Sequence, residues 1–473
     1  MSKLRSMRGI LASSIGVTCA AALALPLAPP ATAAAARPAP TAEAATRAAV
    51  TAQPDAPGST QSLPLRPLTH DRVSGATLGL TPRTVRHFSL LGVIWDDAAA
   101  ELHGSVQVRT RAAADGGWSD WQDVETHYTE HGADPGTSEA APGRVRGATA
   151  PLWVGESDGV EVRVRPEPGE PGAGSEADDS GDDSPAAGSP GLPSGLRLEL
   201  IDPGDAAAPL PAEAADARTS PLSAEATAAS AANSSLVAPG ATEIPALDAE
   251  RTRQELLSLR GAELTEEQRA KPYIGPRPAI VTRRGWGANE SLREKRFVYT
   301  SKVKAAFVHH TASGNNYTCA QAPSLVRGFY RYHVRSLGWR DIGYNFLVDK
   351  CGRIYEGRAG GVAKAVMGAH TMGFNSNTTG IAVIGSYGSK KPSSSAKKAV
   401  ARLTAWKLGL HGMNPRAKTY LKSGGGNLYR KGKKVRLNVI SGHRDGFNTS
   451  CPGGKLYKKL GTVRSTAARY QGR

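Results

Sequence analysis

The sequence has few cysteines and few long apolar runs. It holds four cysteines in 473 residues. One long apolar run covers residues 9–25, and no later segment reaches the roughly 20 apolar residues that a membrane-spanning helix needs. A chain of this length predicts two or three domains, each with a core of its own. The shortage of apolar runs excludes a protein with several membrane spans, and the length of the chain excludes a minimal scaffold.

The first 33 residues have the order typical of a secretory signal. Lys3 and Arg5 come first, the apolar run follows, and small residues end at Ala33. A membrane anchor is the alternative, but prolines from Pro26 onward shorten the run too much for a span. A lipid-anchored Cys19 lacks the usual small-residue motif before it. We therefore predict a cleaved signal peptide at 1–33 and a secreted protein that is associated with the cell wall, with no stable membrane insertion.

Signal removal leaves three cysteines: Cys319, Cys351 and Cys451. In an oxidising compartment two of them can pair, and the third needs another use, such as a metal ligand or an exposed reactive thiol. We predict a disulfide between Cys319 and Cys351, and we assign Cys451 to chemistry.

Acidic residues are scarce in the second part of the chain. Residues 271–473 hold 38 Lys and Arg against 6 Asp and Glu, a net charge of +32, whereas residues 1–270 hold 21 against 36, a net charge of −15. A surplus of this size indicates an anionic partner. Secretion argues against nucleic acid and favours the anionic polymers and free carboxylates of a bacterial wall. The alternative is that the basic residues only keep the domain soluble.

The first half of the chain predicts a tether followed by an all-β domain. Residues 34–63 are rich in Ala, Pro and Thr and lack the large apolar residues that a core requires, so we expect a disordered tether. Period-two alternation in residues 64–204 predicts antiparallel strands in a sandwich-like domain of unknown role. A polar insertion at 169–191 is expected to be a disordered loop. Trp118 and Trp121 either form a platform that stacks on sugar rings or pack in the core or at a strand edge.

The second half predicts a linker and an α/β domain. Residues 205–270 form an Ala- and Pro-rich linker with a helix near its end, from 247 to 270. Residues 271–473 alternate strands with amphipathic helices, which predicts a mixed central β-sheet flanked by helices. The expected strands are 303–310, 344–349, 354–356, 381–385 and 435–441, and the expected helices are 320–335, 394–408 and one that begins at Lys455.

Histidines at two predicted strand ends form the strongest chemical signal. His309 and His310 end one apolar strand, and His443 ends another, with Cys451 eight residues later. In α/β folds ligands bind at strand ends. Two imidazoles and one thiolate form a three-ligand set for one Zn²⁺ ion and leave a fourth position open for water. Alternation sends His309 and His310 to opposite faces, so one of them reaches the metal. Taken singly, each histidine has a structural role as its alternative.

These motifs resemble those of the peptidoglycan recognition proteins and the phage-type zinc amidases, the type 2 amidase family. The resemblance covers residues 280–457 and includes Val308-His309-His310-Thr311-Ala312 and Gly442-His443-Arg444-Asp445 with Cys451-Pro452-Gly453. Further blocks lie at residues 282–288, 338–346, 354–358, 368–370 and 380–381. The resemblance implies that His309, His443 and Cys451 bind zinc. Members that bind wall fragments without cutting them lack the cysteine ligand, so Cys451 favours an enzyme.

The resemblance implies hydrolysis of the amide bond between N-acetylmuramic acid and L-alanine in peptidoglycan. Tyr344 matches the tyrosine beside the metal, whose phenol can donate a hydrogen bond to the developing oxyanion; a purely packed tyrosine is the alternative. At the position of Thr449, phage members of the family carry a lysine, whereas the recognition proteins carry a threonine as this sequence does. A threonine can donate a hydrogen bond but supplies no charge. The implied contacts to the muramyl peptide are His310, Thr311, His370 and Asn375.

Two arginines have open roles at this stage. Arg340 and Arg358 can bind stem-peptide carboxylates bidentately, or they can form structural ion pairs with Asp341 or Glu356. Residues 360–364 depart from the pattern that separates diaminopimelate from lysine in the animal recognition proteins, so that choice stays open. His333 and His411 lie in or beside predicted helices, and we assign both to structure.

Three classes of function remain. They are a wall-cutting amidase, a peptidoglycan-binding protein that does not cut, and a secreted zinc peptidase. The absence of a His-Glu-x-x-His motif argues against the common zinc peptidases. We predict a monomeric zinc amidase whose partners are peptidoglycan and, through the basic domain, anionic wall polymers, with no nucleic acid partner.

Overall fold

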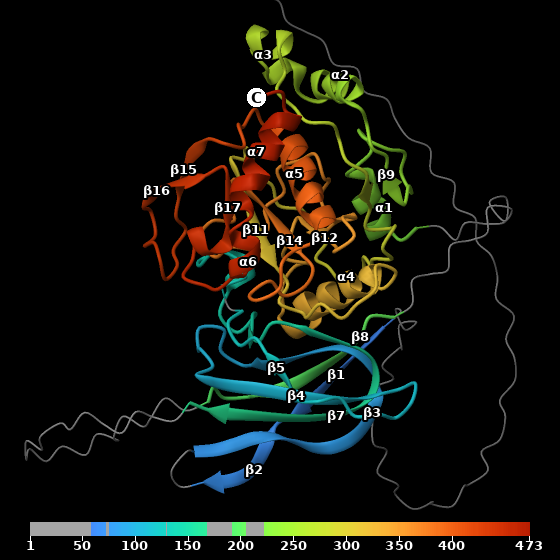
Figure 1. Cartoon of the computed structure of the whole chain (residues 1–473), viewed down its shortest axis with the longest axis vertical. Helices are drawn as coiled ribbons and strands as arrows, with labels where there is room; N and C mark the ends of the chain where they lie inside the picture. The colour runs from blue at the N-terminus through green and yellow to red at the C-terminus, as the bar shows by residue number, and fades with distance from the viewer. Residues whose placement is uncertain (1–57, 72–74, 129, 168–191, 205–221) are drawn as a thin grey trace, which may run out of the picture. The chain divides into compact units, whose positions relative to one another are not determined.

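The computed structural model describes residues 58–71, 75–128, 130–167, 192–204 and 222–473 (Figure 1). The predicted signal peptide, most of the tether and the insertion at 169–191 lie outside these residues. Among the helices that the structure describes, none is both long and apolar enough to cross a membrane.

The N-terminal part is an antiparallel β domain, which confirms the predicted fold class. Its eight strands share one sheet with the order β1-β8-β3-β7-β4-β5, and β2 and β6 also pair with β3. The strands are β1 (Ser59–Pro64), β2 (Arg66–Asp71), β3 (Gly75–Trp95), β4 (Gly104–Ala112), β5 (Gln122–Val124), β6 (Gly147–Ala148), β7 (Leu152–Pro166) and β8 (Arg197–Asp202).

Alternate residues of these strands form the core of the β domain. Val160, Val162 and Val164 of β7 are fully buried, as are Leu198 and Leu200 of β8. This is the spacing that places side chains on one face of a sheet. β1 begins at Ser59, so the folded part starts before residue 64, where the composition placed its boundary. The reason is that β1 pairs along its whole length with β8, a partner that local composition does not reveal.

The C-terminal part contains the predicted mixed sheet. Seven strands have the order β17-β11-β14-β12-β13-β10-β9. β11 runs parallel to β14 and β17, whereas β13 is antiparallel to β12. The strands are β9 (Glu243–Ile244), β10 (Ile280–Val281), β11 (Ala305–His310), β12 (Phe346–Val348), β13 (Ile354–Glu356), β14 (Thr378–Val383) and β17 (Ile440–Gly442), and a separate hairpin consists of β15 (Lys418–Lys422) and β16 (Lys434–Asn438).

Helices cover both faces of this sheet. The helices are α1 (Ala224–Ala231), α2 (Ala249–Arg260), α3 (Glu266–Ala270), α4 (Ala322–Arg331), α5 (Ser394–Gly409), α6 (Gly454–Tyr457) and α7 (Leu460–Tyr470). Val308 and Ile381 pack with α5 and α7, which lie side by side (Figure 1). Leu347 and Ala382 pack in the cluster that contains α4. Because both faces are covered, β11 and β14 are buried at every position, as expected of parallel strands.

Two boundaries differ from the prediction. β9 pairs with β10 and so extends the sheet, which means that this sheet begins inside the stretch 205–270 that was assigned to linker plus helix. The strand expected at 435–441 is two strands, because β16 pairs with β15 whereas β17 pairs with β11.

The β domain and the α/β domain share one hydrophobic cluster. It contains Leu90, Ile94 and Trp153 of the β domain together with Phe329 and Tyr332 of the α4 region. The Tyr332 hydroxyl also donates a hydrogen bond to the Thr149 carbonyl at 3.0 Å. Burial of this shared cluster holds the two domains together as one packed body.

Candidate metal centre

The carboxyl ends of β11 and β17 bring the predicted zinc ligands together. β11 ends with His309 and His310, and β17 ends one residue before His443. Because the two strands are parallel neighbours, their ends lie at the same edge of the sheet. The ring centroids of His309 and His443 are 4.6 Å apart, and Cys451 Sγ lies 3.8 Å from His309 Nδ1.

A fourth residue completes this cluster, and it comes from the β domain. His131, between β5 and β6, places Nε2 at 3.5 Å from Cys451 Sγ and its ring centroid at 4.5 Å from that of His443. The donor atoms of His131, His309, His443 and Cys451 all lie within 4.8 Å of one another, and all four residues are buried. We name these four residues the His₃Cys cluster. No motif or spacing in the sequence pointed to His131.

The cluster fits a zinc ion. Zinc–sulfur and zinc–nitrogen bond lengths in a tetrahedral site imply sulfur–nitrogen separations of about 3.6 Å, close to the 3.5 and 3.8 Å observed. Both ring nitrogens of His443 are buried without a hydrogen-bond partner. Buried polar atoms are nearly always paired, so the unpaired nitrogens indicate a missing partner.

The electrostatics of the cluster also suit a cation. Burial, reinforced by the neighbouring histidines, lowers the pKa of His309 and His443 well below 6.5, so both imidazoles are neutral and can act as ligands. Burial raises the pKa of the Cys451 thiol well above its usual value. A thiolate at this position therefore needs a bound cation, which deprotonates a coordinating thiol.

A second set of contacts orients His309. Its Nε2 atom lies 3.3 Å from Thr371 Oγ1 and 3.3 Å from His370 Nδ1. The side-chain oxygen of Asn375 accepts from the backbone N–H groups of His370 and Thr371 at 2.7 and 3.1 Å. Gly380 leaves room for the His370 ring, because an added Cβ would lie 2.3 Å from its Cγ. Contacts of this kind fix the ring orientation of a metal-binding histidine.

The two predicted catalytic side chains lie beside the cluster. The Tyr344 ring centroid is 5.5 Å from that of His309. Burial, together with the neighbouring Tyr128, raises the Tyr344 pKa well above 10, so its phenol stays protonated and can donate. Thr449 Oγ1 accepts from the Cys451 backbone N–H at 3.1 Å and donates to the carboxylate of Glu130 at 2.6 Å.

His310 and Thr311, two of the predicted substrate contacts, make hydrogen bonds inside the fold. His310 Nδ1 accepts from the Tyr387 N–H at 3.2 Å, away from the His₃Cys cluster, as strand alternation requires. Thr311 Oγ1 accepts from the Gly385 N–H at 2.9 Å.

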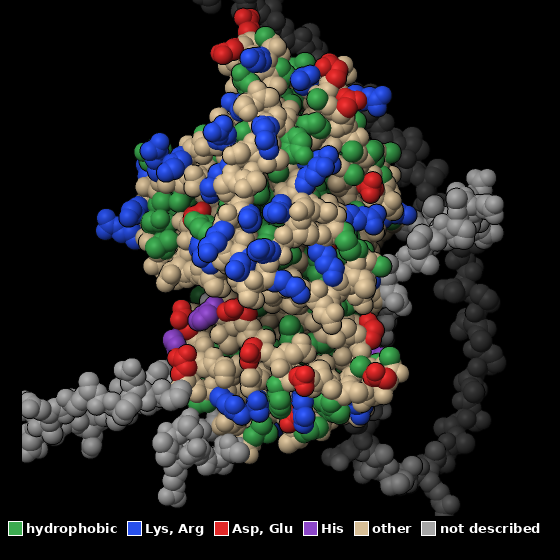
Figure 2. Space-filling view, in the orientation of Figure 1, with side chains coloured by type: hydrophobic (Ala, Val, Ile, Leu, Met, Phe, Trp, Pro, Cys, Tyr) green, Lys and Arg blue, Asp and Glu red, His purple; other side chains and the backbone are tan. Residues whose placement is uncertain are grey.

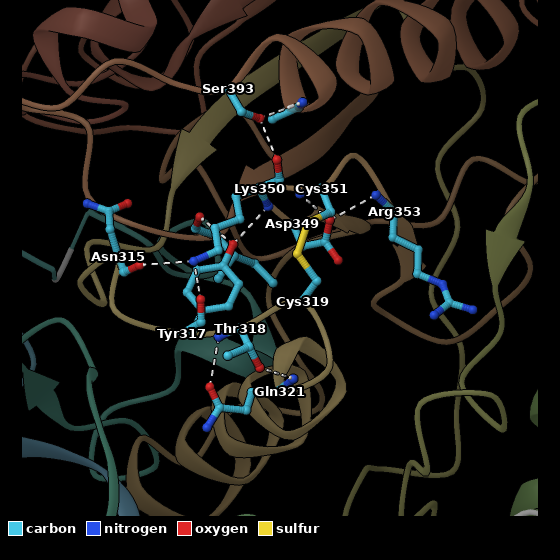
Figure 3. The surroundings of a disulfide bond; sticks show 12 residues. Asn315, Tyr317, Thr318, Cys319, Gln321, Asp349, Lys350, Cys351, Arg353 and Ser393 are labelled. Carbon is cyan, nitrogen blue, oxygen red and sulfur yellow. Dashed lines mark hydrogen bonds between the residues drawn. A yellow bond between two sulfur atoms is a disulfide. The ribbon is translucent and has the colours of Figure 1, made fainter.

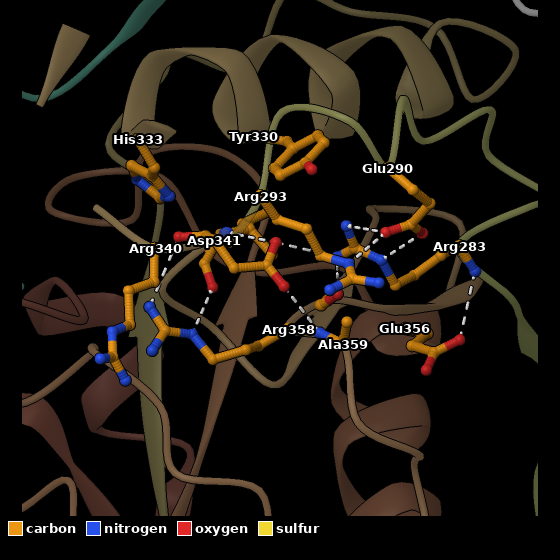
Figure 4. Close-up of polar contacts among 12 residues, drawn as sticks. Arg283, Glu290, Arg293, Tyr330, His333, Arg340, Asp341, Glu356, Arg358 and Ala359 are labelled. Carbon is orange, nitrogen blue, oxygen red and sulfur yellow. Dashed lines mark hydrogen bonds and ion pairs between the residues drawn. The ribbon is translucent and has the colours of Figure 1, made fainter. Parts of the chain in front are cut away.

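Arg340 and Arg358 both form ion pairs, and Figure 4 shows their side chains near Asp341. Arg340 lies 2.9 Å from Glu294, and Arg358 lies 2.7 Å from Glu139 of the β domain. The pairs with Asp341 or Glu356 that the sequence offered as an alternative do not form. Asp341 instead pairs with Arg283, at 3.0 Å.

The predicted disulfide between Cys319 and Cys351 is present (Figure 3). It joins the start of the α4 region to the turn after β12, with a Cα–Cα distance of 6.2 Å. The turn itself is held by Asp349 Oδ1, which accepts from the N–H groups of Cys351 and Arg353 at 2.9 Å each. Cys451 is left as the free, buried thiol.

The remaining candidates make contacts within the fold. Arg163 lies 3.9 Å from the centroid of the Trp121 ring, and Trp118 bridges to Arg111 of β4 at the sheet edge. His333 Nε2 lies 2.7 Å from the Tyr128 hydroxyl, and His411 Nδ1 lies 3.2 Å from Arg260.

Comparison with known proteins separates two regions. The family model described as N-acetylmuramoyl-L-alanine amidase matches residues 299–454. The model described as Rv3811 N-terminal galactose-binding domain-like matches residues 41–189. Peptidoglycan-recognition protein SC2 of Drosophila simulans is 32% identical over 183 residues, which are 39% of this chain and 85% of that protein. The chain belongs to the peptidoglycan recognition protein family.

A second curated relative matches over a similar share of the chain. Peptidoglycan recognition protein 1 of Bos taurus is 32% identical over 38% of this chain and 81% of that protein. Among solved structures, Drosophila PGRP-LB is 25% identical, covers 39% of this chain and 92% of that chain, and has a TM-score of 0.31. In the present chain, His309, His443 and Cys451 lie within the residues that match the amidase model. His131 lies within the residues that match the galactose-binding-like model.

Proposed function

We propose that this protein is a zinc-dependent N-acetylmuramoyl-L-alanine amidase that cuts the amide bond between N-acetylmuramic acid and L-alanine in bacterial peptidoglycan. The observation that carries the proposal is Cys451, which lies beside His309 and His443 at the carboxyl edge of the sheet. A buried thiol at this place supplies the third ligand of a catalytic zinc set. The amidase match over 299–454 supports the same conclusion.

Each residue then has a defined task. His309, His443 and Cys451 would hold the zinc ion, which when bound lowers the pKa of a water ligand and polarises a carbonyl oxygen. Thr371 keeps His309 in the orientation in which Nδ1 faces Cys451. Tyr344, whose phenol stays protonated, donates a hydrogen bond to the oxyanion that forms at the lactyl carbonyl.

The substrate contacts are proposals of the same kind. His310, Thr311, His370 and Asn375 follow from the family motifs, and Arg340 follows from the chemistry of its guanidinium group. Asn375 and Arg340 carry donors that suit the carbonyl and carboxylate groups of a stem peptide. The disulfide Cys319–Cys351 is typical of proteins in oxidising compartments and supports secretion to the cell wall.

An exposed basic hairpin supports a second contact, with anionic wall polymers. Figure 2 shows Lys and Arg side chains on the part of the surface that carries β15 and β16. The exposed basic residues of this hairpin are Arg416, Lys418, Lys422, Arg430, Lys431, Lys433, Lys434 and Arg436. Binding of a polyanion here should weaken as ionic strength rises. The test compares wall binding at low and high salt by the native protein and by the variant Lys418→Glu/Lys434→Glu. This contact would be contradicted if binding did not depend on salt and if both proteins bound equally well.

The experiment that tests the main proposal measures peptides released from purified peptidoglycan by the full chain. We expect peptides that begin with L-alanine, which disappear with a chelator and return with added zinc. Wall binding without release, by the native chain and also when His131 is replaced by alanine, would favour a receptor that does not cut. Peptides cut within the stem would favour a zinc peptidase.

A further inference from the structure

A segment of the β domain extends into the metal centre, and the proposed reaction gives this segment no role. We propose that residues 130–139, which we name the plug segment, act as an internal pseudosubstrate that keeps the amidase latent, with His131 closing the metal position that water would need. This inference rests on the proposed amidase function and concerns the regulation of the same site.

The first support is the number of protein donors. A catalytic zinc site has three protein ligands and one open position, whereas a site with four protein ligands is closed and structural. His309, His443 and Cys451 already make three, and His131 Nε2, at 3.5 Å from Cys451 Sγ, makes a fourth. With His131 in place, the position for water or for the substrate carbonyl is taken.

The plug segment also occupies the proposed catalytic side chains. Glu130 accepts the hydrogen bond of the Thr449 hydroxyl at 2.6 Å, and its carbonyl accepts from the Met372 N–H at 3.0 Å. Two residues before the plug segment, the Tyr128 hydroxyl lies 3.3 Å from that of Tyr344. The phenol that should stabilise the oxyanion therefore has a hydroxyl of the β domain within hydrogen-bond distance.

Asp134 fills an anion subsite built by the proposed substrate contacts. Its Oδ1 atom accepts from the side-chain amide of Asn375 at 2.7 Å and from the Gly373 N–H at 2.9 Å. The same Asn375 amide donates to the Gly132 carbonyl at 2.7 Å. A peptide carbonyl and a carboxylate thus lie together on Asn375, as they would in a bound acidic peptide.

The far end of the plug segment occupies the two arginines. Glu139 accepts two hydrogen bonds from Arg358, at 2.7 and 2.9 Å, and one from the Arg340 N–H at 3.2 Å. Ser138 accepts from the Arg340 guanidinium at 2.9 Å. Bidentate carboxylate binding is one of the two roles that the sequence left open for these arginines. The plug segment therefore presents carboxylates and carbonyls to Asn375 and Arg340, two of the donors proposed for the substrate, and to Arg358.

The plug segment is anchored at its carboxyl side. It continues into β6, which pairs with β3, and Ala133 lies in the hydrophobic cluster that both domains share. Opening the site requires that this segment be displaced. When only a small fraction of a protein is in the state that can bind substrate, its apparent affinity falls in proportion to that fraction. Closure of the site by the plug segment therefore keeps the enzyme latent.

The test compares the zinc-loaded full chain with His131→Ala and with the matched control His127→Ala, whose side chain is exposed. We expect one zinc per chain in all three proteins. His131→Ala should release zinc to a chelator, and release L-alanyl peptides from peptidoglycan, roughly tenfold faster or more than the native chain. His127→Ala should match the native chain in both measurements.

A second variant tests the plug segment without touching the cluster. Gly143 is exposed and lies between the plug segment and β6. A specific protease site inserted at this residue, once cut, should also raise both rates, because the cut frees the carboxyl anchor. Zinc release unchanged in both variants would overturn the plug, as would loss of zinc from His131→Ala. Faster zinc release without cleavage by any protein would overturn the amidase and leave the plug intact.

Discussion

Thr371 Oγ1 lies 3.3 Å from Nε2 of His309, the ring nitrogen that does not face Cys451. The contact ties a proposed zinc ligand to the loop before β14, where Asn375 accepts from the Thr371 backbone N–H. It makes the loop part of the metal site, although the loop supplies no ligand.

Replacing this threonine should weaken metal binding. Thr371→Val keeps the shape but removes the hydrogen bond to His309, so zinc affinity should fall about 10- to 100-fold. Competition with a zinc chelator of known affinity measures the change. Thr379→Val is the matched control, because Thr379 Oγ1 is buried with no hydrogen-bond partner. Equal loss in both variants would show that Thr371 acts only through packing.

Replacing the thiol should remove the zinc. Cys451→Ser leaves the small buried side chain in place but exchanges the thiolate for a poorer zinc ligand. Zinc affinity and peptide release should therefore fall by more than the roughly 100-fold upper limit for a supporting contact. Zinc stoichiometry after dialysis checks the prediction. A variant that retains cleavage would refute the ligand assignment.

The disulfide should contribute to global stability. Cys319 and Cys351 are 32 residues apart, and closing a loop of that size stabilises the fold by about 4 kcal/mol in the chain-entropy description. The double variant Cys319→Ser/Cys351→Ser should lose about that much free energy of unfolding in urea. Zinc stoichiometry should not change, because the cysteines of the disulfide lie outside the His₃Cys cluster.

Lys407 of α5 predicts a pH dependence of stability. Burial, with a contribution from Arg260, lowers its pKa from 10.5 to about 7, and its Nζ donates to the carbonyls of Val362 and Lys364 at 2.6 and 2.7 Å. Between pH 7 and 10.5 the unfolded chain binds this proton and the folded chain does not, so stability rises with pH in that window.

The size of this effect can be measured against one variant. Between pH 7 and pH 9 the native chain should gain about 2 kcal/mol in free energy of unfolding relative to Lys407→Met. Urea unfolding of both proteins at the two pH values supplies the comparison. An identical pH response in the two proteins would mean that Lys407 keeps its proton in the folded state.

The parts of the fold that follow from local pattern were predictable from the sequence. The mixed sheet could be inferred because its strands are apolar runs separated by amphipathic helices, and β11 and α5 lie within two residues of their expected bounds. β9 escaped notice because a two-residue strand has no periodicity. The proposed zinc ligands of the α/β domain were predictable because each lies at or shortly after a strand end within a family motif.

The rest of the site depends on contacts between distant residues. His131 lies 320 residues before Cys451 and comes from another domain, so no spacing connects it to the cluster. The same holds for Glu139, which pairs with Arg358 across 219 residues in place of the sequence neighbours that we considered. Side chains that close a site from another domain are set by tertiary packing, which a single sequence does not display.

The most direct test of the central claim is mass spectrometry of the peptides released from purified peptidoglycan by the zinc-loaded full chain and its His131→Ala variant, each with and without a chelator. The account predicts peptides that begin with L-alanine, released only when zinc is bound, and more of them from His131→Ala. Proteins that hold one zinc ion and bind the wall, yet release no such peptide, would contradict it.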